Sequence, residues 1–378
     1  MKLLHAFSTF AIGGSQARFA QLVDRLGNGY HHHVTAMDAD VAGFPALEIV
    51  TCPERLTPFT LPVQKTGSIS LDNVRQFSRT LQDQNVDGLC TYNFGSIEWS
   101  IANRFINKKP HLHFEDGFGS DESLTKQLRR RVFGRRLAIG SKTTIVVPSK
   151  GLEGLARDRW GFKDQQIRRI PNGVDVQRFY SPPGGRSFRT HPDEIIVGTI
   201  GALRPEKNYG RLLRAFQKAS ADLPLRLIVV GDGAERSALE ALASTLEIDD
   251  RIVFCGSVSD AQNYYCGFDI FALSSDTEQL PMTVLEAMAA GKPVLSTDVG
   301  DIQDTVSEEN HRFISPLDDE TALVHGMKVL AASSSLREHI GSQNASRAQS
   351  VFSIDTMMDR YSDLLAETVP ESTNASGS

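Results

Sequence analysis

Two glutamates lie eight residues apart around a proline in this 378-residue chain, at Glu278 and Glu286. Pro281 suits the first position of a helix, Glu286 falls inside that helix, and Gly291 marks its end. The amides at a helix N-terminus bind phosphate oxygens, and a carboxylate beside them accepts hydrogen bonds from hydroxyls. The segment therefore predicts a site that holds a phosphate and a sugar together. On periodicity alone, two solvated glutamates on an amphipathic surface helix are the simpler interpretation.

Arg204 and Lys207 lie three residues apart near the start of another predicted helix, just after an apolar run that ends at Gly201. Two cations in that position can neutralise a diphosphate and stabilise it as a leaving group. The alternative is that both are solvated charges on a helix surface. Two more segments stand out, a turn at 170–175 (Ile-Pro-Asn-Gly-Val-Asp) and a strand with a glycine turn at 227–233 (Leu-Ile-Val-Val-Gly-Asp-Gly).

In this order and at this spacing, the four segments resemble the C-terminal half of the retaining GT-B glycosyltransferases of family 4, the glycosyl transferases group 1. The resemblance is strong over residues 165–300 and weak elsewhere. It implies an α/β fold of two Rossmann-like, doubly wound parallel-sheet domains that face a cleft. It also implies transfer of a sugar, with retention, from a nucleoside diphosphate-sugar in the C-terminal domain to an acceptor in the N-terminal domain, with no metal and no other cofactor.

The resemblance also assigns a donor site. Glu286 is similar to the carboxylate that binds the two ribose hydroxyls, and Glu278 to the one that contacts the transferred sugar. The remaining donor contacts would come from the amides of Leu280, Met282 and Thr283, which would face sugar and phosphate oxygens, and from the backbone near Val258, which would border the nucleobase.

The chain departs from the family pattern at two positions. Lys207 matches the family cation directly, but the family arginine commonly lies two positions before Arg204, where this chain has Ala202. Arg204 would then reach the same phosphates from a shifted position. Gln279 stands where family members often have glycine, so any backbone shape that needs glycine there must be reached in another way.

Candidate residues in the N-terminal half are Gly14, His113 and Asp116. The resemblance places Gly14 at the cleft beside the donor phosphates. Residues 111–119 are dense in titratable groups and end in glycines, which predicts a cleft loop rather than a core strand. Relatives place a histidine or an acid there, facing the anomeric carbon, and the sequence does not choose between His113 and Asp116. A polar surface turn is the alternative; neither this segment nor the triplet 31–33, which we predict to be surface, has the ligand spacing of a metal site.

Charge is distributed unevenly along the chain. Residues 1–180 carry 24 Lys and Arg against 17 Asp and Glu, whereas the remainder carries 16 against 29, which predicts an anionic partner for the first half. Segment 124–142 has no acid and seven cations, with apolar residues at helical spacing. A basic amphipathic helix of this kind can lie on an anionic bilayer; alternatively its apolar stripe packs on its own domain and its arginines are solvated. Recognition motifs for nucleic acid are missing.

Apolar runs alternate with helical patterns, which is typical of parallel α/β sheets. We predict strands at 3–7, 34–37, 88–92, 144–148, 195–200, 226–230, 252–254, 270–273 and 294–297, and helices at 15–26 and 353–367. The Pro- and Gly-rich composition after Tyr180 indicates a domain boundary. The expected division is an acceptor-binding domain over 1–180, a donor domain over 181–352, a helix at 353–367 that packs back on the first domain, and a disordered tail over 368–378.

Together with the basic segment, the resemblance implies a hexosyltransferase that uses a nucleotide sugar and takes part in the synthesis of cell-surface polysaccharide, lipopolysaccharide or glycolipid. No run of eighteen apolar residues exists, and the four cysteines form no close pair, so we expect a reduced cytoplasmic protein without a signal peptide, peripheral on the inner face of the plasma membrane if the basic segment binds lipid. Two other classes stay open, a GT-B sugar-nucleotide epimerase and a catalytically silent nucleotide-sugar-binding protein. The sugar, the base and the acceptor are not specified by the sequence.

Overall fold

The computed structural model of the chain describes residues 1–39, 43–63, 69–118, 122, 124, 126–180 and 187–369. Contacts divide it into two units: unit 1 contains residues 1–171 and the chain from Met357, and unit 2 contains residues 172–356. The sequence-based boundary lies nine residues later, because the turn-rich composition begins only at 181. The short helix α7 (Val176–Tyr180) belongs to unit 2, where its Phe179 lies in the core. Residues 370–378, most of the predicted tail, fall outside the described residues.

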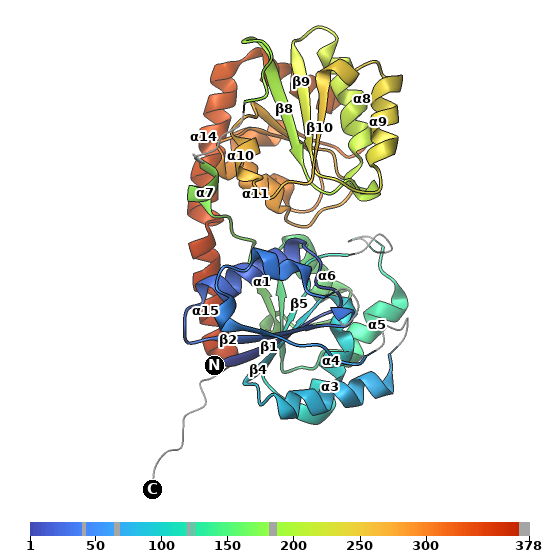
Figure 1. The fold of residues 1–378 in the computed structure, drawn as a ribbon, viewed down its shortest axis with the longest axis vertical. Helices are drawn as coiled ribbons and strands as arrows, with labels where there is room; N and C mark the ends of the chain where they lie inside the picture. Colours follow the sequence, from blue (N-terminus) through green and yellow to red (C-terminus); the bar gives the residue numbers. More distant parts are fainter. Residues whose placement is uncertain are drawn as a thin grey trace. The chain divides into compact units, whose positions relative to one another are not determined.

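Unit 1 is built on a parallel sheet in the order β3-β2-β1-β4-β5-β6-β7, as far as its described residues show (Figure 1). The strands are β1 (Lys2–Phe7), β2 (His31–Ala36), β3 (Leu56–Pro58), β4 (Gly88–Tyr92), β5 (His111–Phe114), β6 (Thr143–Val147) and β7 (Ile167–Arg169). Apolar residues on alternate positions of these strands face both sides, so the sheet is covered by helices on both faces, as parallel sheets require.

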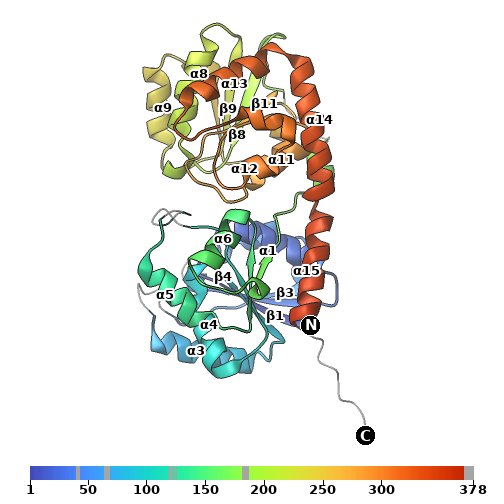
Figure 2. The same cartoon turned by 180° about the vertical axis from the view of Figure 1, so that it is seen from behind.

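The helices of unit 1 are α1 (Gly14–Arg25), α3 (Leu71–Asp83), α4 (Ile97–Ala102), α5 (Arg129–Ala138), α6 (Lys150–Asp158) and α15 (Ile354–Thr368). On one face of the sheet, α3 and α4 stack Phe77 on Trp99, with ring centroids 4.1 Å apart. On the other face, α1 and α15 cover Phe7 and Phe114, and Tyr361 of α15 lies against the Phe114 ring. Figure 2 shows the same unit from behind.

Unit 2 is built on a second parallel sheet, whose order among the described residues is β10-β9-β8-β11-β12-β13. The strands are β8 (Ile195–Ile200), β9 (Leu225–Val230), β10 (Ile252–Gly256), β11 (Ile270–Leu273), β12 (Val294–Thr297) and β13 (Ile314–Ser315). The helices are α7, α8 (Tyr209–Ser220), α9 (Arg236–Thr245), α10 (Gln262–Tyr265), α11 (Met282–Ala289), α12 (Ile302–Thr305), α13 (Glu320–Ala332) and α14 (Ser334–Val351). Helices α8, α9 and α13 enclose one apolar cluster and α7, α10 and α11 the other.

The predicted fold class is confirmed, since each unit is a doubly wound α/β domain with a parallel sheet. Within the described residues, no helix is both long and apolar enough to cross a bilayer. Two predictions about polar segments are wrong. Residues 111–114 form the buried strand β5 rather than a cleft loop, and residues 31–33 belong to β2, where His32 and His33 are buried rather than on the surface.

The basic segment also differs from its prediction. Its helix α5 spans Arg129–Ala138, shorter than the predicted 124–142. Arg135 is buried and forms an ion pair, so the seven cations are not all solvated. Leu137, which recurs at helical spacing with Leu124, Leu128 and Val132, is 43% exposed, and the nearby Phe133 is 68% exposed. The helix therefore turns charge inward and apolar groups outward at these positions.

Candidate functional site

The loops after β8 and β11 meet at one edge of the second sheet. These strands are parallel neighbours, with Val197 opposite Ile270, so both end at the same edge. Ser274, the residue after β11, donates from Oγ to the carbonyl oxygens of Lys207 and Asn208, at 3.1 and 3.0 Å. The two segments that the sequence analysis singled out are therefore held together by a side-chain contact to the main chain.

Lys207 and Glu278 form an ion pair at this edge. Lys207 Nζ donates to Glu278 Oε1 at 2.6 Å, and Ser275 Oγ donates to the same oxygen at 2.7 Å. The two side chains are 25% and 11% exposed, so a ligand can reach the pair without unfolding the loop. In the part of the chain that the structure describes, Glu278 Oε2 accepts no hydrogen bond, which leaves it available to a ligand hydroxyl.

Gly300 fixes the backbone beneath this pair. It has a φ of +59°, and a Cβ there would lie 2.5 Å from the carbonyl oxygen of Glu278 and 2.6 Å from that of Gln279. The amide of Asp301 donates to the Gln279 carbonyl at 2.9 Å. Gln279 is not among the described residues with a positive φ, so glycine is not needed at 279. The close approach is provided by Gly300 on the neighbouring loop instead.

Helix α11 begins directly after Pro281, close to the predicted start. Leu280, Met282 and Thr283 surround its N-terminus, where the first amides of a helix have no partner within the helix. Asn172 Nδ2 donates to the Leu280 carbonyl at 2.9 Å, which connects the predicted 170–175 turn to this loop. The arrangement leaves donor groups beside Glu278 in the manner of an anion-binding helix end.

Glu286 lies within α11 and is held by a tyrosine. Tyr265 OH donates to Glu286 Oε2 at 2.7 Å, and burial raises the pKa of Glu286 to about 7. The hydrogen bond and the charge of Arg178 act in the opposite direction and stabilise the carboxylate. The sequence analysis did not single out Tyr265, which lies 21 residues earlier in α10, and no local pattern marks it.

Two other predicted residues of unit 2 do not join the ion pair. Arg204 is 64% exposed and lies 4.0 Å from Glu206, its nearest carboxylate among the described residues. Val258 follows β10 and packs, half-buried, against the core cluster that includes α11. The proposed phosphate contact of Arg204 and nucleobase contact of Val258 therefore stay predictions. Lys207 is the cation that the fold places beside Glu278.

In unit 1, Gly14 is the first residue of α1 and is exposed. A Cβ at Gly14 would meet no atom within 4 Å, so the fold itself does not require glycine there. The preceding Gly13 has extended backbone and caps the helix without a side chain. The predicted role of Gly14 near donor phosphates stays a prediction.

His113 is enclosed in a buried polar network. Its Nδ1 lies 2.8 Å from Thr91 Oγ1 and its Nε2 lies 3.1 Å from Glu115 Oε2. Arg135 donates to both oxygens of Glu115, at 2.8 and 3.2 Å, and despite burial this guanidinium holds the pKa of Glu115 at about 2. Both ring nitrogens of His113 thus have protein partners, and the ring is fully buried in this structure.

Asp116 lies just beyond β5 and forms an ion pair with Arg18 of α1. The Asp116 amide donates to Asn93 Oδ1 at 2.8 Å, which joins the loops after β4 and β5. The Asp116 side chain is 14% exposed, whereas His113 has no exposed surface. Both carboxylate oxygens of Asp116 are nevertheless buried, so the choice between His113 and Asp116 stays open.

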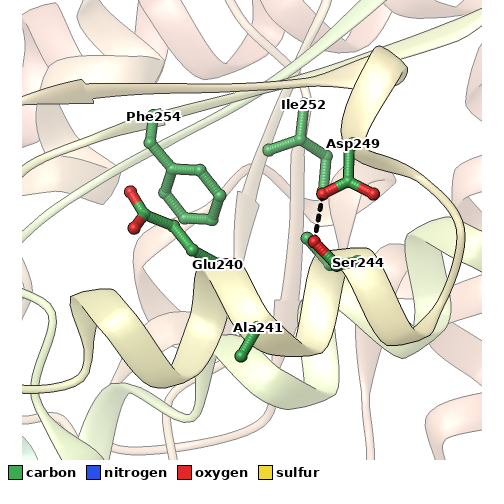
Figure 3. A pocket seen from close by; sticks show the side chains of 7 residues that line it. Glu240, Ala241, Ser244, Asp249, Ile252 and Phe254 are labelled. Atoms are coloured by element: carbon green, nitrogen blue, oxygen red, sulfur yellow. Dashed lines mark hydrogen bonds between the residues drawn. The ribbon is translucent and has the colours of Figure 1, made fainter.

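A small pocket of about 270 Å³ lies on the outer surface of unit 2, between α9 and β10. Figure 3 shows Ser244 of α9 donating to Asp249, with Phe254 and Ile252 on the strand side. None of the predicted site residues lines it. This pocket is therefore separate from the Lys207–Glu278 pair.

Two family models match the chain. Glycosyl transferases group 1 matches residues 186–347, and Glycosyltransferase Family 4 matches residues 12–178. Among curated relatives, N-acetyl-alpha-D-glucosaminyl L-malate synthase of Bacillus anthracis is 24% identical, over 68% of this chain and 66% of the relative. Lipopolysaccharide core biosynthesis glycosyltransferase LpsE of Rhizobium meliloti is 29% identical, over 59% of this chain and 64% of the relative. Each match spans less than two thirds of the relative's length.

A solved structure gives the same answer for the fold. HepE of Anabaena, crystallised in complex with UDP, superposes with a TM-score of 0.77 at 18% identity and covers 97% of this chain and 100% of the HepE chain. Likeness at this identity establishes the fold alone. The two parallel-sheet units and this likeness establish the GT-B fold, and the family models and relatives make the chain similar to glycosyltransferases in both of its halves.

Proposed function

We propose that the protein transfers a sugar from a nucleoside diphosphate-sugar to an acceptor hydroxyl, with unit 2 binding the donor and unit 1 the acceptor. The observation that carries the proposal is the Lys207–Glu278 ion pair, which lies before the N-terminus of α11, with Glu286 inside the same helix. Two adjoining loops and the start of α11 thus offer a cation, amides and two carboxylates. These are the groups that a diphosphate, a ribose and a hexose need.

In this assignment, Glu286 accepts hydrogen bonds from the ribose hydroxyls and Glu278 Oε2 accepts one from the transferred sugar. Lys207 and the amides of Met282 and Thr283 contact the diphosphate. Because Lys207 is already paired with Glu278 at 2.6 Å, it would contact the phosphate while it keeps its hydrogen bond to that carboxylate. Such bridging fixes the sugar relative to its leaving group.

We assign the reaction a retaining course. The bond from the anomeric carbon to the leaving phosphate oxygen breaks while the acceptor oxygen bonds to the same face, and the acceptor proton passes to that phosphate oxygen. Lys207 and the positive end of α11 stabilise the negative charge that develops on the diphosphate. This course requires no metal and no other cofactor.

The comparisons support a nucleotide sugar and a cell-surface product. HepE is described in complex with UDP, and LpsE is named for lipopolysaccharide core biosynthesis. By analogy, the acceptor of this chain belongs to polysaccharide, lipopolysaccharide or glycolipid synthesis. We place the reaction in the cytoplasm, at the inner face of the plasma membrane.

The surface of unit 1 supports the membrane location. Phe105 and Ile106 on one side, and Phe133 and Leu137 of α5 on the other, are all exposed by 43% or more. Arg104 joins the two sides, because its guanidinium donates to the carbonyl oxygens of Arg136 and Leu137. We call this surface the α5 patch and define it by four apolar and three basic exposed residues: Phe105, Ile106, Phe133 and Leu137 with Arg104, Lys108 and Arg136. Aromatic groups among cations suit an anionic lipid bilayer.

A panel of nucleotide sugars tests the function directly. A specific donor at 100 times its Kd raises the free energy of unfolding by about 2.7 kcal/mol, so the correct donor should increase the Tm while others do not. The stabilising donor is then incubated with candidate acceptors, and proton NMR of the product reports the anomeric configuration. Inversion would overturn the retaining course. Consumption of donor without acceptor would indicate an epimerase, and stabilisation without turnover by any acceptor a silent binding protein.

A further inference from the structure

A cavity in unit 1 has a volume of about 600 Å³, which is in the range of small-molecule sites. It opens at the carboxyl ends of the strands, since Ser8, Asn93 and Glu115 directly follow or lie just past β1, β4 and β5. Ligands of parallel α/β sheets bind at this edge. Helix α5 forms another wall of the cavity and contributes three arginines, Arg130, Arg131 and Arg135.

The acids of this cavity are already engaged. Glu115 is paired with Arg135, and Glu122 accepts from Arg131 at 3.0 Å. Glu98, 6% exposed, accepts from the amide of Ser70 through one oxygen and from Asn73 through the other. These carboxylates are buried and already accept hydrogen bonds from protein donors, so a hydrogen bond from a ligand would add little binding free energy.

Two of the arginines keep hydrogen-bond donors without a partner among the described residues. Arg130 is exposed and forms no ion pair among the described residues. Arg135 is 1% exposed, and its Nη1 is a buried nitrogen with no hydrogen-bond partner in the described structure. A buried guanidinium nitrogen without an acceptor is costly and rare. The cavity therefore has spare hydrogen-bond donors and a cation, but no spare acceptor of comparable strength.

Aromatic rings complete the cavity. Phe94 and Phe118 line it, and the Arg135 guanidinium lies 5.1 Å from the Phe94 ring centroid. Gly134 permits the Phe94 ring to pack closely on α5, because a Cβ at 134 would lie 3.0 Å from that ring. The cavity thus combines flat apolar faces with a positive rim. Such a wall suits a sugar ring or a short apolar chain that carries an anionic group.

We propose that this cavity binds the acceptor and that the acceptor carries an anionic group, a phosphate or a carboxylate, which Arg130 contacts. The proposal rests on the proposed function, which supplies the acceptor, and adds the chemical class of that acceptor. The same group could belong to a soluble sugar phosphate or to the head of a lipid. Both sources place an oxyanion against a guanidinium, which is a charge-assisted contact.

Matched pairs of probes test the charge requirement by isothermal titration calorimetry. Glucose 1-phosphate is compared with methyl α-glucoside, and octyl phosphate with octyl glucoside below its micellar concentration. The charged member of at least one pair should bind, and its neutral counterpart at least tenfold more weakly. A preference for octyl phosphate supports a lipid source, and a preference for glucose 1-phosphate a soluble one. Equal affinity for charged and neutral members would overturn the proposal.

Variants locate the binding. Arg130→Gln should weaken the charged probe about tenfold, while Arg130→Lys should keep most of the affinity. The matched control is Arg129→Gln, because Arg129 is an exposed neighbour on α5 that does not line the cavity. Both tryptophans, Trp99 and Trp160, belong to unit 1, and Trp160 packs on Arg135 at 4.5 Å, so the probe should also change tryptophan emission. Equal loss in Arg129→Gln and Arg130→Gln would overturn the assignment of Arg130.

A second comparison separates this proposal from the function on which it rests. Lys207→Ala should lose affinity for UDP or GDP but keep the charged probe, and Arg130→Gln should do the reverse. If the probe depends on Lys207 and not on Arg130, it binds in unit 2 and the cavity proposal fails. If neither nucleotide binds the wild type while Arg130-dependent binding of the probe persists, the proposed function fails and the anion-binding cavity stands.

Discussion

Tyr265 OH lies 2.7 Å from Glu286 Oε2, so a buried tyrosine donates a hydrogen bond to a carboxyl group whose pKa is raised. The hydrogen bond favours the ionised carboxylate, whereas burial disfavours it, and burial prevails. Because the pKa of Glu286 is about 7, its charge changes near neutral pH. The ribose contact proposed for Glu286 needs the ionised form.

Nucleotide affinity should therefore depend on pH. Below about pH 7 Glu286 takes up a proton and can no longer accept two hydrogen bonds, so the affinity for UDP or GDP should fall as pH decreases from 8.5 to 5.5. Tyr265→Phe removes a donor to the carboxylate and should move the midpoint of this fall to higher pH. Titration calorimetry in buffers of one ionic strength measures both. In Glu286→Ala the affinity should be low and the midpoint near pH 7 absent; an unchanged midpoint there would contradict the assignment.

The two carboxylates should separate nucleotide binding from turnover. Glu286→Ala should weaken a free nucleoside diphosphate about tenfold, since hydrogen bonds to a charged group contribute roughly 1.5–3 kcal/mol. Glu278→Ala should leave that affinity nearly unchanged and lower turnover of the sugar donor. Affinity for the free nucleotide and kcat are measured on the same preparations. Identical nucleotide affinity in wild type and Glu286→Ala would remove Glu286 from the ribose site.

Lys207→Ala should lower kcat by about two orders of magnitude, because it removes a charged donor from a developing anion. Arg204→Ala should have a smaller effect, since Arg204 is 64% exposed and lies outside the ion pair. Lys218→Ala is the matched control: Lys218 is an exposed lysine of α8 that contacts Glu320 and lies outside the site. Full activity in Lys207→Ala would mean that the diphosphate is held by other groups.

Acid should destabilise unit 1 through its buried histidines. Burial lowers the pKa of His32 and of His111 to about 3, from an ordinary value near 6.5. The unfolded chain then binds more protons, so stability is full above pH 6.5 and falls as pH decreases toward 3; at pH 5 the loss is about 2 kcal/mol for each such histidine. Tryptophan emission reports unit 1 during thermal unfolding.

Relative to wild type, His32→Asn should show a smaller decrease in Tm between pH 7.5 and pH 5. The exposed His325 of α13 supplies the control variant, His325→Gln, which should keep the full decrease. A Tm of the wild type that does not change over this range would contradict the buried, neutral state of these rings.

The α5 patch should bind anionic vesicles. Flotation with phosphatidylglycerol vesicles should carry the protein upward at low salt and release it at high salt, because screening shortens to about 3 Å at 1 M. Phe133→Ser with Leu137→Ser should abolish flotation without changing nucleotide affinity. Leu71→Ser is the control, since Leu71 is 69% exposed in the same unit but lies on α3. If the wild type does not float with anionic vesicles, the patch is an ordinary surface.

Many of the strand positions were accessible from the sequence, because continuous apolar runs bounded by turn residues are strands in α/β proteins. The strands at 88–92, 195–200, 270–273 and 294–297 match the structure at both ends. Strand β5 and the histidine-rich start of β2 were missed, since their polar residues look solvated in isolation. In the fold, His111 and His113 both lie 2.8 Å from Thr91 Oγ1, a partner on the adjacent strand that no local pattern reveals.

The candidate site shows the same limit. The resemblance placed Lys207 and Glu278 in one donor site, and in the structure their loops leave the neighbouring parallel strands β8 and β11. The burial of Arg135 was not predicted, since its partner Glu115 is 20 residues away on another element. Pairing with that acid turned one face of α5 inward and left Phe133 and Leu137 in solvent. Helical spacing does not reveal long-range ion pairs of this kind, although Val132 of the predicted stripe does pack against the core.

The main-chain contacts that hold residues 278–280 have a consequence for how the side chains of this loop could change. Gly300 touches the main chain of Glu278 and Gln279, Asp301 bonds the carbonyl of 279, and Asn172 bonds that of Leu280. All three contacts involve main-chain oxygens of the loop, and none depends on which side chains the loop carries. Side chains at these positions can therefore be exchanged during evolution or in a mutant library while the scaffold that presents them is inherited unchanged.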